Sequence, residues 1–320
     1  MISNLLMLFL AFSCITGNAL SLYSYSPLKY GGINTDLWNL SSASGNVTMC
    51  VNGTLRANVN LTSISEKDPN DVVAGYPEIG YGRNLEDESW GPEEYLYFPL
   101  ELNKFVSFNY SASISYRLNV PKNLPNDFSF DFWVENRPSP GHSPGPGDLE
   151  VMIWLYHTPS LYPAGDPYLT LTLPVTVNGV TENVEWTIYN GTGGANTRIL
   201  TFESDEPVDS GTVLIDLSYF FEEVELLGNY SSFFLMGVEL GTEFGTFNGG
   251  AHLSLYVYNY TLQNKSYGIE LVTSSPVPSS STSQPVTAST SPNSFYIAEL
   301  ALVVIIFTLI VIAVYGRRRR

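Results

Sequence analysis

Apolar and polar residues alternate with a period of two along most of the chain between residues 22 and 262. This period is typical of β-strands, whose successive side chains point to opposite faces of a sheet. Turn residues separate the alternating segments, and Asn52-Gly53 predicts a hairpin within residues 46–60. The other expected strands cover residues 105–120, 128–134, 149–155, 168–177, 184–189, 197–203, 212–217, 233–240 and 251–260. Many short strands with little helix between them predict an all-β, antiparallel sandwich or barrel.

One segment has a helical period instead. Its apolar residues are Phe220, Phe221, Val224 and Leu227, which fall on one side of a helix. Ser218 is available as an N-cap, and Gly228 is a natural stop. The pattern predicts one short helix that contributes to packing.

The N-terminus has the pattern of a secretory signal peptide. An apolar run from Leu5 to Ile15 precedes Gly17-Asn18-Ala19, so a signal peptide over residues 1–19 is expected. An uncleaved anchor helix is the alternative. Cys14 would leave with the peptide, so Cys50 would have no partner and the mature domain, residues 20–272, would have no intrachain disulfide.

The C-terminal part has a different composition. Residues 273–294 contain 13 Ser or Thr and 4 Pro, which predicts an extended linker. Residues 295–316 are predicted as a transmembrane helix, in which Glu299 is the only charged residue. The basic tail, residues 317–320, would stay on the cytoplasmic side, so the large domain would lie outside the cell. Nine glycosylation sequons agree with that location; they begin at Asn39, Asn46, Asn52, Asn60, Asn109, Asn190, Asn229, Asn259 and Asn264.

The formal net charge of −17 argues against a nucleic-acid partner, because phosphates require basic patches. It is compatible with a neutral polysaccharide.

Two carboxylates have the setting of a sugar site. In residues 147–155, Leu149, Val151, Ile153 and Leu155 form an apolar row, and Asp148, Glu150, Met152 and Trp154 form the opposite row. A carboxylate beside large apolar side chains suits a site where sugar rings stack and acids do the chemistry. Glu243 ends another apolar strand and enters a Gly-rich turn. Two carboxylates from different strands can flank a glycosidic bond, although a solvated edge residue and a loop carboxylate are the simpler interpretations.

Five motifs occur in the order found in glycoside hydrolase family 12, the endo-β-1,4-glucanases. Gly147-Asp148-Leu149-Glu150-Val151-Met152-Ile153-Trp154-Leu155 resembles the nucleophile strand, and Gly241-Thr242-Glu243-Phe244-Gly245 resembles the acid/base motif. Leu37-Trp38-Asn39 resembles the family's N-terminal cleft strand, and Gly75-Tyr76-Pro77-Glu78-Ile79-Gly80-Tyr81-Gly82 its Tyr-Pro-containing strand. Phe130-Asp131-Phe132-Trp133 resembles the strand that carries a supporting acid. Two departures are Phe244, where others often have Pro or Ala, and Cys50, which lacks the expected disulfide partner.

The resemblance implies a two-sheet antiparallel jelly roll with a concave substrate cleft and a retaining double displacement. By match, Glu150 is the nucleophile, Glu243 the acid/base and Asp131 a supporting acid, with no cofactor or metal. Trp38, Met152, Trp154 and Tyr189 would bind substrate. The expected protein is a monomeric, surface-anchored endo-β-1,4-glucanase; a xyloglucan- or mixed-linkage-specific hydrolase and a non-catalytic glycan-binding surface protein are the alternatives.

Overall fold

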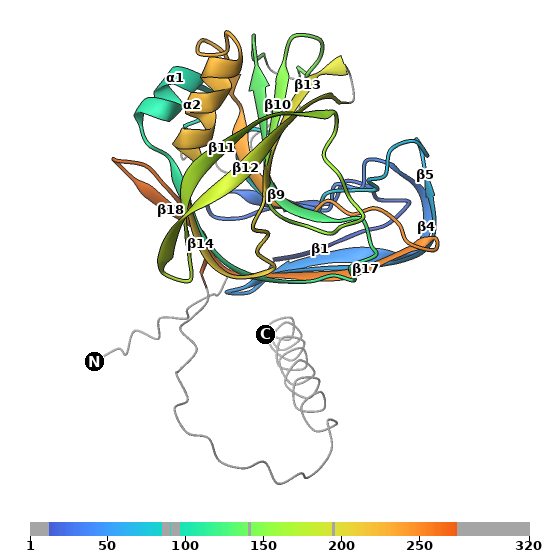
Figure 1. Ribbon diagram of the computed structural model, residues 1–320. Coiled ribbons are helices and arrows are strands. Elements are labelled where there is room, and N and C mark those ends of the chain that lie inside the picture. The colour runs from blue at the N-terminus through green and yellow to red at the C-terminus, as the bar shows by residue number, and fades with distance from the viewer. Residues whose placement is uncertain (1–12, 85–89, 91–96, 140–141, 194–195, 274–320) are drawn as a thin grey trace, which may run out of the picture. The chain divides into compact units, whose positions relative to one another are not determined.

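The computed structural model describes residues 13–84, 90, 97–139, 142–193 and 196–273, all within one compact unit. Their strands form a sandwich of two β-sheets with two short helices at one end (Figure 1). The predicted linker, transmembrane helix and basic tail lie outside the described residues, apart from Thr273. Within the described ranges, no helix is both long and apolar enough to span a bilayer.

The outer sheet has the strand order β1, β4, β5, β17, β8, β14, and all its pairings are antiparallel. A further strand, β18 (Gly268–Thr273), pairs with the C-terminal half of β17. The main strands are β1 (Ser13–Gly17), β4 (Leu40–Val51), β5 (Leu55–Glu66), β17 (Gly250–Gln263), β8 (Ser111–Asn119) and β14 (Ser210–Asp216).

The inner sheet has the order β2, β3, β6, β16, β9, β10, β13, β12, β11. Only the β10–β13 pairing is parallel among these. At one edge β11 also pairs with β14, which joins the two sheets. The strands are β2 (Tyr25–Pro27), β3 (Gly32–Asn34), β6 (Glu78–Gly82), β16 (Gly237–Gly241), β9 (Asp127–Glu135), β10 (Leu149–His157), β13 (Arg198–Ser204), β12 (Val180–Thr192) and β11 (Asp166–Val177), with the two-residue strands β7 (Leu100–Glu101) and β15 (Phe234–Leu235) alongside.

The core lies between the sheets and follows the alternation of the sequence. Strand β9 shows this most clearly, because Phe128, Phe130, Phe132 and Val134 are fully buried in it. The residues between them point to the opposite face of the inner sheet, away from the core. The predicted all-β sandwich is confirmed, and so is the hairpin at Asn52-Gly53, where only Gly53 has a positive φ.

The described residues contain two helices, where the sequence predicted one within the domain. The predicted helix is α2 (Leu217–Leu227), and Gly228 follows it as expected. Its N-cap is Asp216 and not Ser218: the Asp216 carboxylate accepts a hydrogen bond of 3.0 Å from the Ser218 backbone N–H. The second helix is α1 (Leu102–Ser107), which replaces the predicted start of a strand at residue 105.

The N-terminal strand corrects the prediction for the cysteines. Cys14 on β1 forms a disulfide with Cys50 on β4, so the prediction that Cys50 has no partner is wrong for this structure. A signal peptide ending at residue 19 would remove β1 and this bond together. The signal peptide therefore stays a prediction, and its proposed end conflicts with the position of β1.

One predicted glycosylation site is not accessible in the folded domain. The side chain of Asn39 is 1% exposed, and its amide donates hydrogen bonds to the carbonyls of Val73 and Asp68. Asn46, Asn52, Asn60, Asn109 and Asn229 are exposed.

Candidate active site

The two faces predicted for residues 149–155 are present in β10. Leu149, Val151 and Ile153 are fully buried in the core. Glu150, Met152 and Trp154 lie on the opposite face, beside β9 on one side and β13 on the other. We call this side of the inner sheet the acidic face, because it carries Glu78, Asp131, Glu150 and Glu239 and continues to Asp127 and Glu243.

Asp131 occupies the middle of the acidic face. On β9 it pairs with Met152 of β10 and with Glu239 of β16, so the position opposite Asp131 on β10 is two residues from Glu150, on the same face. The Asp131 side chain is 8% exposed, and its Oδ1 is buried without a hydrogen-bond partner among the described residues. The predicted neighbourhood of Asp131 and Glu150 is therefore present.

Glu243 is held by the turn that follows β16. The Thr242 hydroxyl donates a 2.7 Å hydrogen bond to the Asp127 carbonyl. The Asn126 amide donates to the Thr242 hydroxyl at 2.7 Å and also to the Glu243 carbonyl. Phe244, fully buried, forms β-bridges with Gly75 and Asn126. These contacts fix the backbone of Glu243 at the edge of the acidic face.

The carboxyls of the two predicted catalytic residues interact. Burial, the Asp127 charge and a hydrogen bond with Asp127 raise the pKa of Glu243 well above its usual range, and the Glu150 charge adds to this. Burial, and then the Asp71 charge, raises the pKa of Glu150 from 4.5 to about 7. Two neighbouring carboxyls with raised pKa values favour a state in which one holds a proton and the other is ionised. A glycosidase that uses one carboxylate as nucleophile and one carboxyl as acid needs such a state.

Asp131 belongs to the same electrostatic group. Burial raises its pKa well above the usual range, and the Glu150 and Glu239 charges raise it further. Among the described residues, no Lys or Arg side chain is one of the main groups that shift the pKa values of Asp131, Glu150 and Glu243. Uncompensated burial therefore keeps protons on this face to higher pH than in water.

Two of the predicted substrate-binding residues, Met152 and Trp154, are less exposed than expected. Met152 and Trp154, 5% and 3% exposed, pack with Val73 and Leu161. Trp38 is half-buried against this cluster. Of these three side chains, Trp38 has the largest exposed surface for a ligand. Met152 and Trp154 pack against it in the same cluster.

Tyr189 lies on the same side of the inner sheet as Glu150, two strands away. It pairs with Thr201 of β13, which in turn pairs with Met152. Burial and a hydrogen bond with Glu203 raise the pKa of Tyr189. Glu203 Oε1 lies 3.2 Å from His157 Nε2. Strand β13 therefore separates Tyr189 from the paired acids, and no hydrogen bond or ion pair among the described residues joins Tyr189 to them.

Three residues that the sequence analysis did not single out belong to this face. Glu78 is 4% exposed, accepts a 3.3 Å hydrogen bond from Asn34 and has a buried Oε2 without a partner among the described residues. Trp90 donates a 3.2 Å hydrogen bond to Glu239 and packs on Gly80, where an added Cβ would lie 2.3 Å from the indole. The sequence contained signals that could have identified two of them. The alternation in Val238-Glu239-Leu240 places Glu239 on the face opposite the core, and Glu78 is part of the Tyr76-Pro77-Glu78 motif.

Two observations limit what the face can hold. Within the described ranges, no group of three or more His, Cys, Asp and Glu side chains has the arrangement of a metal site. Two hollows of the described domain lie elsewhere, against β8. The acidic face is identified as the candidate site by its carboxyl chemistry and not by its depth.

Comparison with solved structures shows the same fold in family 12 enzymes. A native family 12 xyloglucanase from Bacillus licheniformis is 18% identical with a TM-score of 0.60, and the match covers 79% of this chain and 100% of that one. Trichoderma harzianum endoglucanase 3 is 21% identical with a TM-score of 0.57, covering 79% and 98%. Rhodothermus marinus endoglucanase cel12A is 18% identical with a TM-score of 0.58, covering 81% and 100%.

The sequence itself gives the family. No curated protein sequence is significantly similar to this chain. The profile of glycosyl hydrolase family 12, however, matches residues 29–265, which is most of the chain and nearly all of the sandwich. With the fold, the order of the motifs and the paired carboxyls in agreement, the chain belongs to glycosyl hydrolase family 12.

Proposed function

We propose that this protein is an endo-β-1,4-glucanase that hydrolyses internal bonds of cellulose-type glucans with retention of configuration. The observation that carries the proposal is the placement of Glu150, on β10, and Glu243, just after β16, on the acidic face of the inner sheet, where the Glu150 charge contributes to the raised pKa of Glu243. Such a pair can divide a glycosidic displacement into two steps, because one carboxylate attacks carbon and the other carboxyl transfers the proton.

In the first step Glu150, ionised, attacks the anomeric carbon and forms a covalent glycosyl-enzyme. Glu243 donates its proton to the departing oxygen, and its more strongly raised pKa supports this role. In the second step Glu243 takes a proton from water, which attacks the anomeric carbon and releases Glu150. Asp131 lies beside Glu150 and acts as a positioning residue, because a protonated Asp131 can share a hydrogen bond with the nucleophile.

Trp38, which keeps accessible surface, is proposed to stack on a sugar ring next to the paired acids. Met152 and Trp154 support it from below, and Tyr189 is a more distant candidate for substrate contact. Xyloglucan and mixed-linkage glucan are the alternative substrates; the first is favoured by the likeness to the Bacillus licheniformis xyloglucanase. A glycan-binding protein without turnover is the alternative from another class.

The first test is a release assay for reducing sugar on swollen cellulose, barley β-glucan and xyloglucan. Glu150→Gln should abolish turnover on all three, and near-normal activity would refute its role as nucleophile. Glu243→Gln should lose activity on polysaccharide but still release a burst of phenol from an aryl cellobioside whose leaving group needs no proton, because only the second step then lacks its base. Glu182→Gln, which changes an exposed residue on β12, is the matched control and should act as wild type.

We further propose that the domain works outside the cell, tethered through residues 273–294 and a membrane helix at 295–316. The support is the composition of these segments and the basic residues 317–320. Fractionation of cells that express the full chain should find the protein in the membrane fraction, accessible to an external protease. Full-length protein in the cytoplasmic fraction would contradict this placement.

A further inference from the structure

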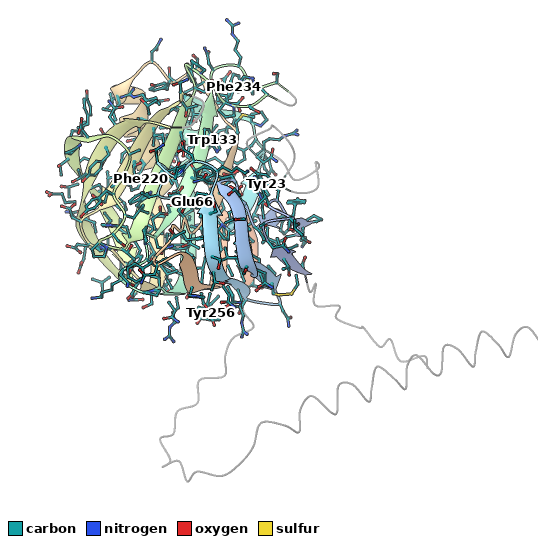
Figure 2. All side chains as sticks on the ribbon, turned by 90° about the vertical axis from the view of Figure 1, so that its right-hand side faces the viewer. Tyr23, Glu66, Trp133, Phe220, Phe234 and Tyr256 are labelled. Atoms are coloured by element: carbon teal, nitrogen blue, oxygen red, sulfur yellow. A yellow bond between two sulfur atoms is a disulfide. The ribbon has the colours of Figure 1, made fainter. Side chains whose placement is uncertain are left out.

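The outer sheet has a row of basic and aromatic side chains on its solvent face. Tyr256 of β17 pairs with Arg56 of β5 on one side and with Arg117 of β8 on the other. Because the neighbouring core residues Leu255 and Val257 point inward, these three side chains point outward together. Figure 2 shows Tyr256 at the lower margin of the domain, away from Trp133, which pairs with Glu150.

The row is electrostatically unusual for this chain. The protein has a formal net charge of −17, yet Arg56 and Arg117 are both exposed and form no ion pair or hydrogen bond with any described residue. The one contact of a guanidinium here is aromatic: Cζ of Arg56 lies 5.6 Å from the ring centroid of Tyr256. Because β17 lies between β5 and β8, the two arginines are two strand spacings apart, about 10 Å across the strands. The charge of the row is therefore open to an anionic partner.

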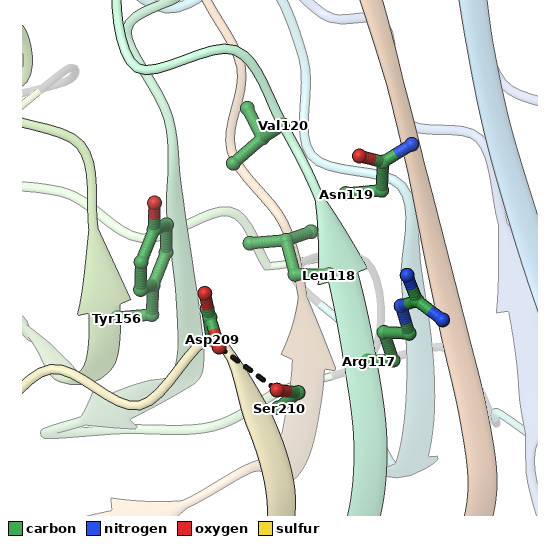
Figure 3. A pocket seen from close by; sticks show the side chains of 7 residues that line it. All are labelled: Arg117, Leu118, Asn119, Val120, Tyr156, Asp209 and Ser210. Atoms are coloured by element: carbon green, nitrogen blue, oxygen red, sulfur yellow. Dashed lines mark hydrogen bonds between the residues drawn. The ribbon is translucent and has the colours of Figure 1, made fainter.

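The surface beside the row is hollowed. One hollow of about 440 Å³ lies between the end of β8, Tyr156 and the start of β14, and Arg117 and Asn119 line it (Figure 3). Asp209 also lines it, where its carboxylate accepts a 2.8 Å hydrogen bond from the Ser210 hydroxyl. A second hollow, of about 470 Å³, is lined by Asn58, Asn60, His252 and Ser254.

The two hollows meet at the end of β8, because Asn119 and Val120 line both. The polar lining consists largely of amide and hydroxyl groups, which donate to and accept from sugar hydroxyls. Tyr256 adds a ring face for stacking, and the two arginines add sites for carboxylates. A single row of two guanidinium groups suits sparse negative charge, whereas the dense phosphates of a nucleic acid need a broad basic surface.

We propose that this outer face binds an acidic polysaccharide, a chain of sugars that carries uronic acid carboxylates at intervals. Arg56 and Arg117 pair with carboxylates of the chain, Tyr256 stacks on a sugar between them, and Asn58 and Asn119 of the hollows bind hydroxyls. This site lies on the opposite sheet from the acidic face. Its binding is independent of the hydrolytic function proposed above, so either can fail without the other.

The test is affinity gel electrophoresis of the full-length protein in gels that contain glucuronoxylan or the same polymer with its carboxyls reduced to alcohols. The two gels differ only in carboxylates, which the acidic face repels, so stronger retardation by the acidic polymer cannot come from the acidic face. At pH 6 the wild type should be retarded at least about fivefold more strongly by the acidic polymer, as expected for charge-assisted hydrogen bonds.

The double variant Arg56→Gln/Arg117→Gln should fall to the level of the reduced polymer. The variant Lys104→Gln/Arg137→Gln removes two charges from exposed positions elsewhere and should bind as wild type. Arg56→Lys/Arg117→Lys should recover part of the retardation, and Tyr256→Ala should weaken binding to both polymers. Hydrolysis of neutral glucan should be unchanged in all of these variants.

Equal retardation by the two polymers would overturn the proposal. So would an equal loss in the Lys104/Arg137 control, because it would show a general charge effect. Thermal unfolding of each variant should match wild type, since the changed side chains are outside the core.

Discussion

Raising the pH from 4 to 7 should destabilise this domain, because its buried and partly buried carboxyls titrate at higher pH in the folded state than in the unfolded state. The pKa values of Glu78, Asp127, Asp131, Glu150 and Glu243 are all raised, in each case mainly by burial. A carboxyl with a raised folded pKa binds more protons when folded, so its stabilisation is complete below the unfolded pKa. It is then lost as the pH rises through the folded pKa.

The size of the effect follows from two of these groups. For Glu150 the pKa moves from 4.5 to about 7, which corresponds to a loss of about 3 kcal/mol between those two pH values. Asp127, fully buried, moves from 3.8 to about 6 and gives a loss of similar size, also about 3 kcal/mol. Because the groups interact, the two losses do not simply add, and at least about 3 kcal/mol is expected overall.

The assay is urea unfolding followed by tryptophan fluorescence at pH 4, 5.5 and 7. The free energy of unfolding should fall as the pH rises, and Glu78→Gln should make the fall shallower because it removes one buried charge while an amide oxygen can still accept from Asn34. Glu182→Gln, an exposed control, should leave the slope unchanged. Stability that stays level or increases from pH 4 to 7 would refute the electrostatic reasoning.

Three further outcomes are expected. Replacing Cys14 and Cys50 together by Ser should cost about 3–4 kcal/mol of stability, because the disulfide closes a loop across a sequence separation of 36; thiol titration of the unfolded wild type that finds two free thiols would contradict the bond. Trp38→Ala should raise the KM on long glucans by about fivefold or more through lost stacking. Its free energy of unfolding should fall by less than the loss of about 3–5 kcal/mol that follows replacement of a fully buried tryptophan. An unchanged KM with a large fall in Tm would make Trp38 structural. Deleting residues 274–320 should leave Tm within a few degrees, since the last strand ends at Thr273; a truncated domain that does not fold would show that the tail is structural.

The strand pattern could be predicted from the sequence because each sheet has one face in the core. Alternation in residues 149–155 identified both the buried row and the face of Glu150, and the Gly-rich turn placed Glu243 at a strand end. What alternation cannot give is strand pairing. Glu239 lies beside Asp131 because β16 pairs with β9, although the two residues are 108 positions apart in the chain (239 − 131). Its place on the acidic face therefore appeared only in the fold.

The errors have similar local causes. Residues 105–107 continue an apolar and polar alternation, which predicted a strand. Leu102 and Phe105, however, are three residues apart and both are buried on one side of α1, so packing stabilises a helix there. Cys14 lies at the end of an apolar run that is typical of a leader peptide. Only the pairing of β1 with β4 brings it next to Cys50. Trp154 and Met152 were expected at the sugar surface, but Val73, which is distant in sequence, and Leu161 pack against them.

The most direct test of the central claim is to trap the covalent intermediate. A 2-deoxy-2-fluoro-cellobioside with an activated leaving group should inactivate the enzyme, because the fluorine slows the second displacement more than the activated first one. Mass spectrometry of the digested protein should then find one fluoro-cellobiosyl group, attached to Glu150. A label on Glu78, Glu239 or another carboxyl would contradict the assignment of the nucleophile, and turnover of natural glucan without any trapped adduct would contradict the retaining mechanism.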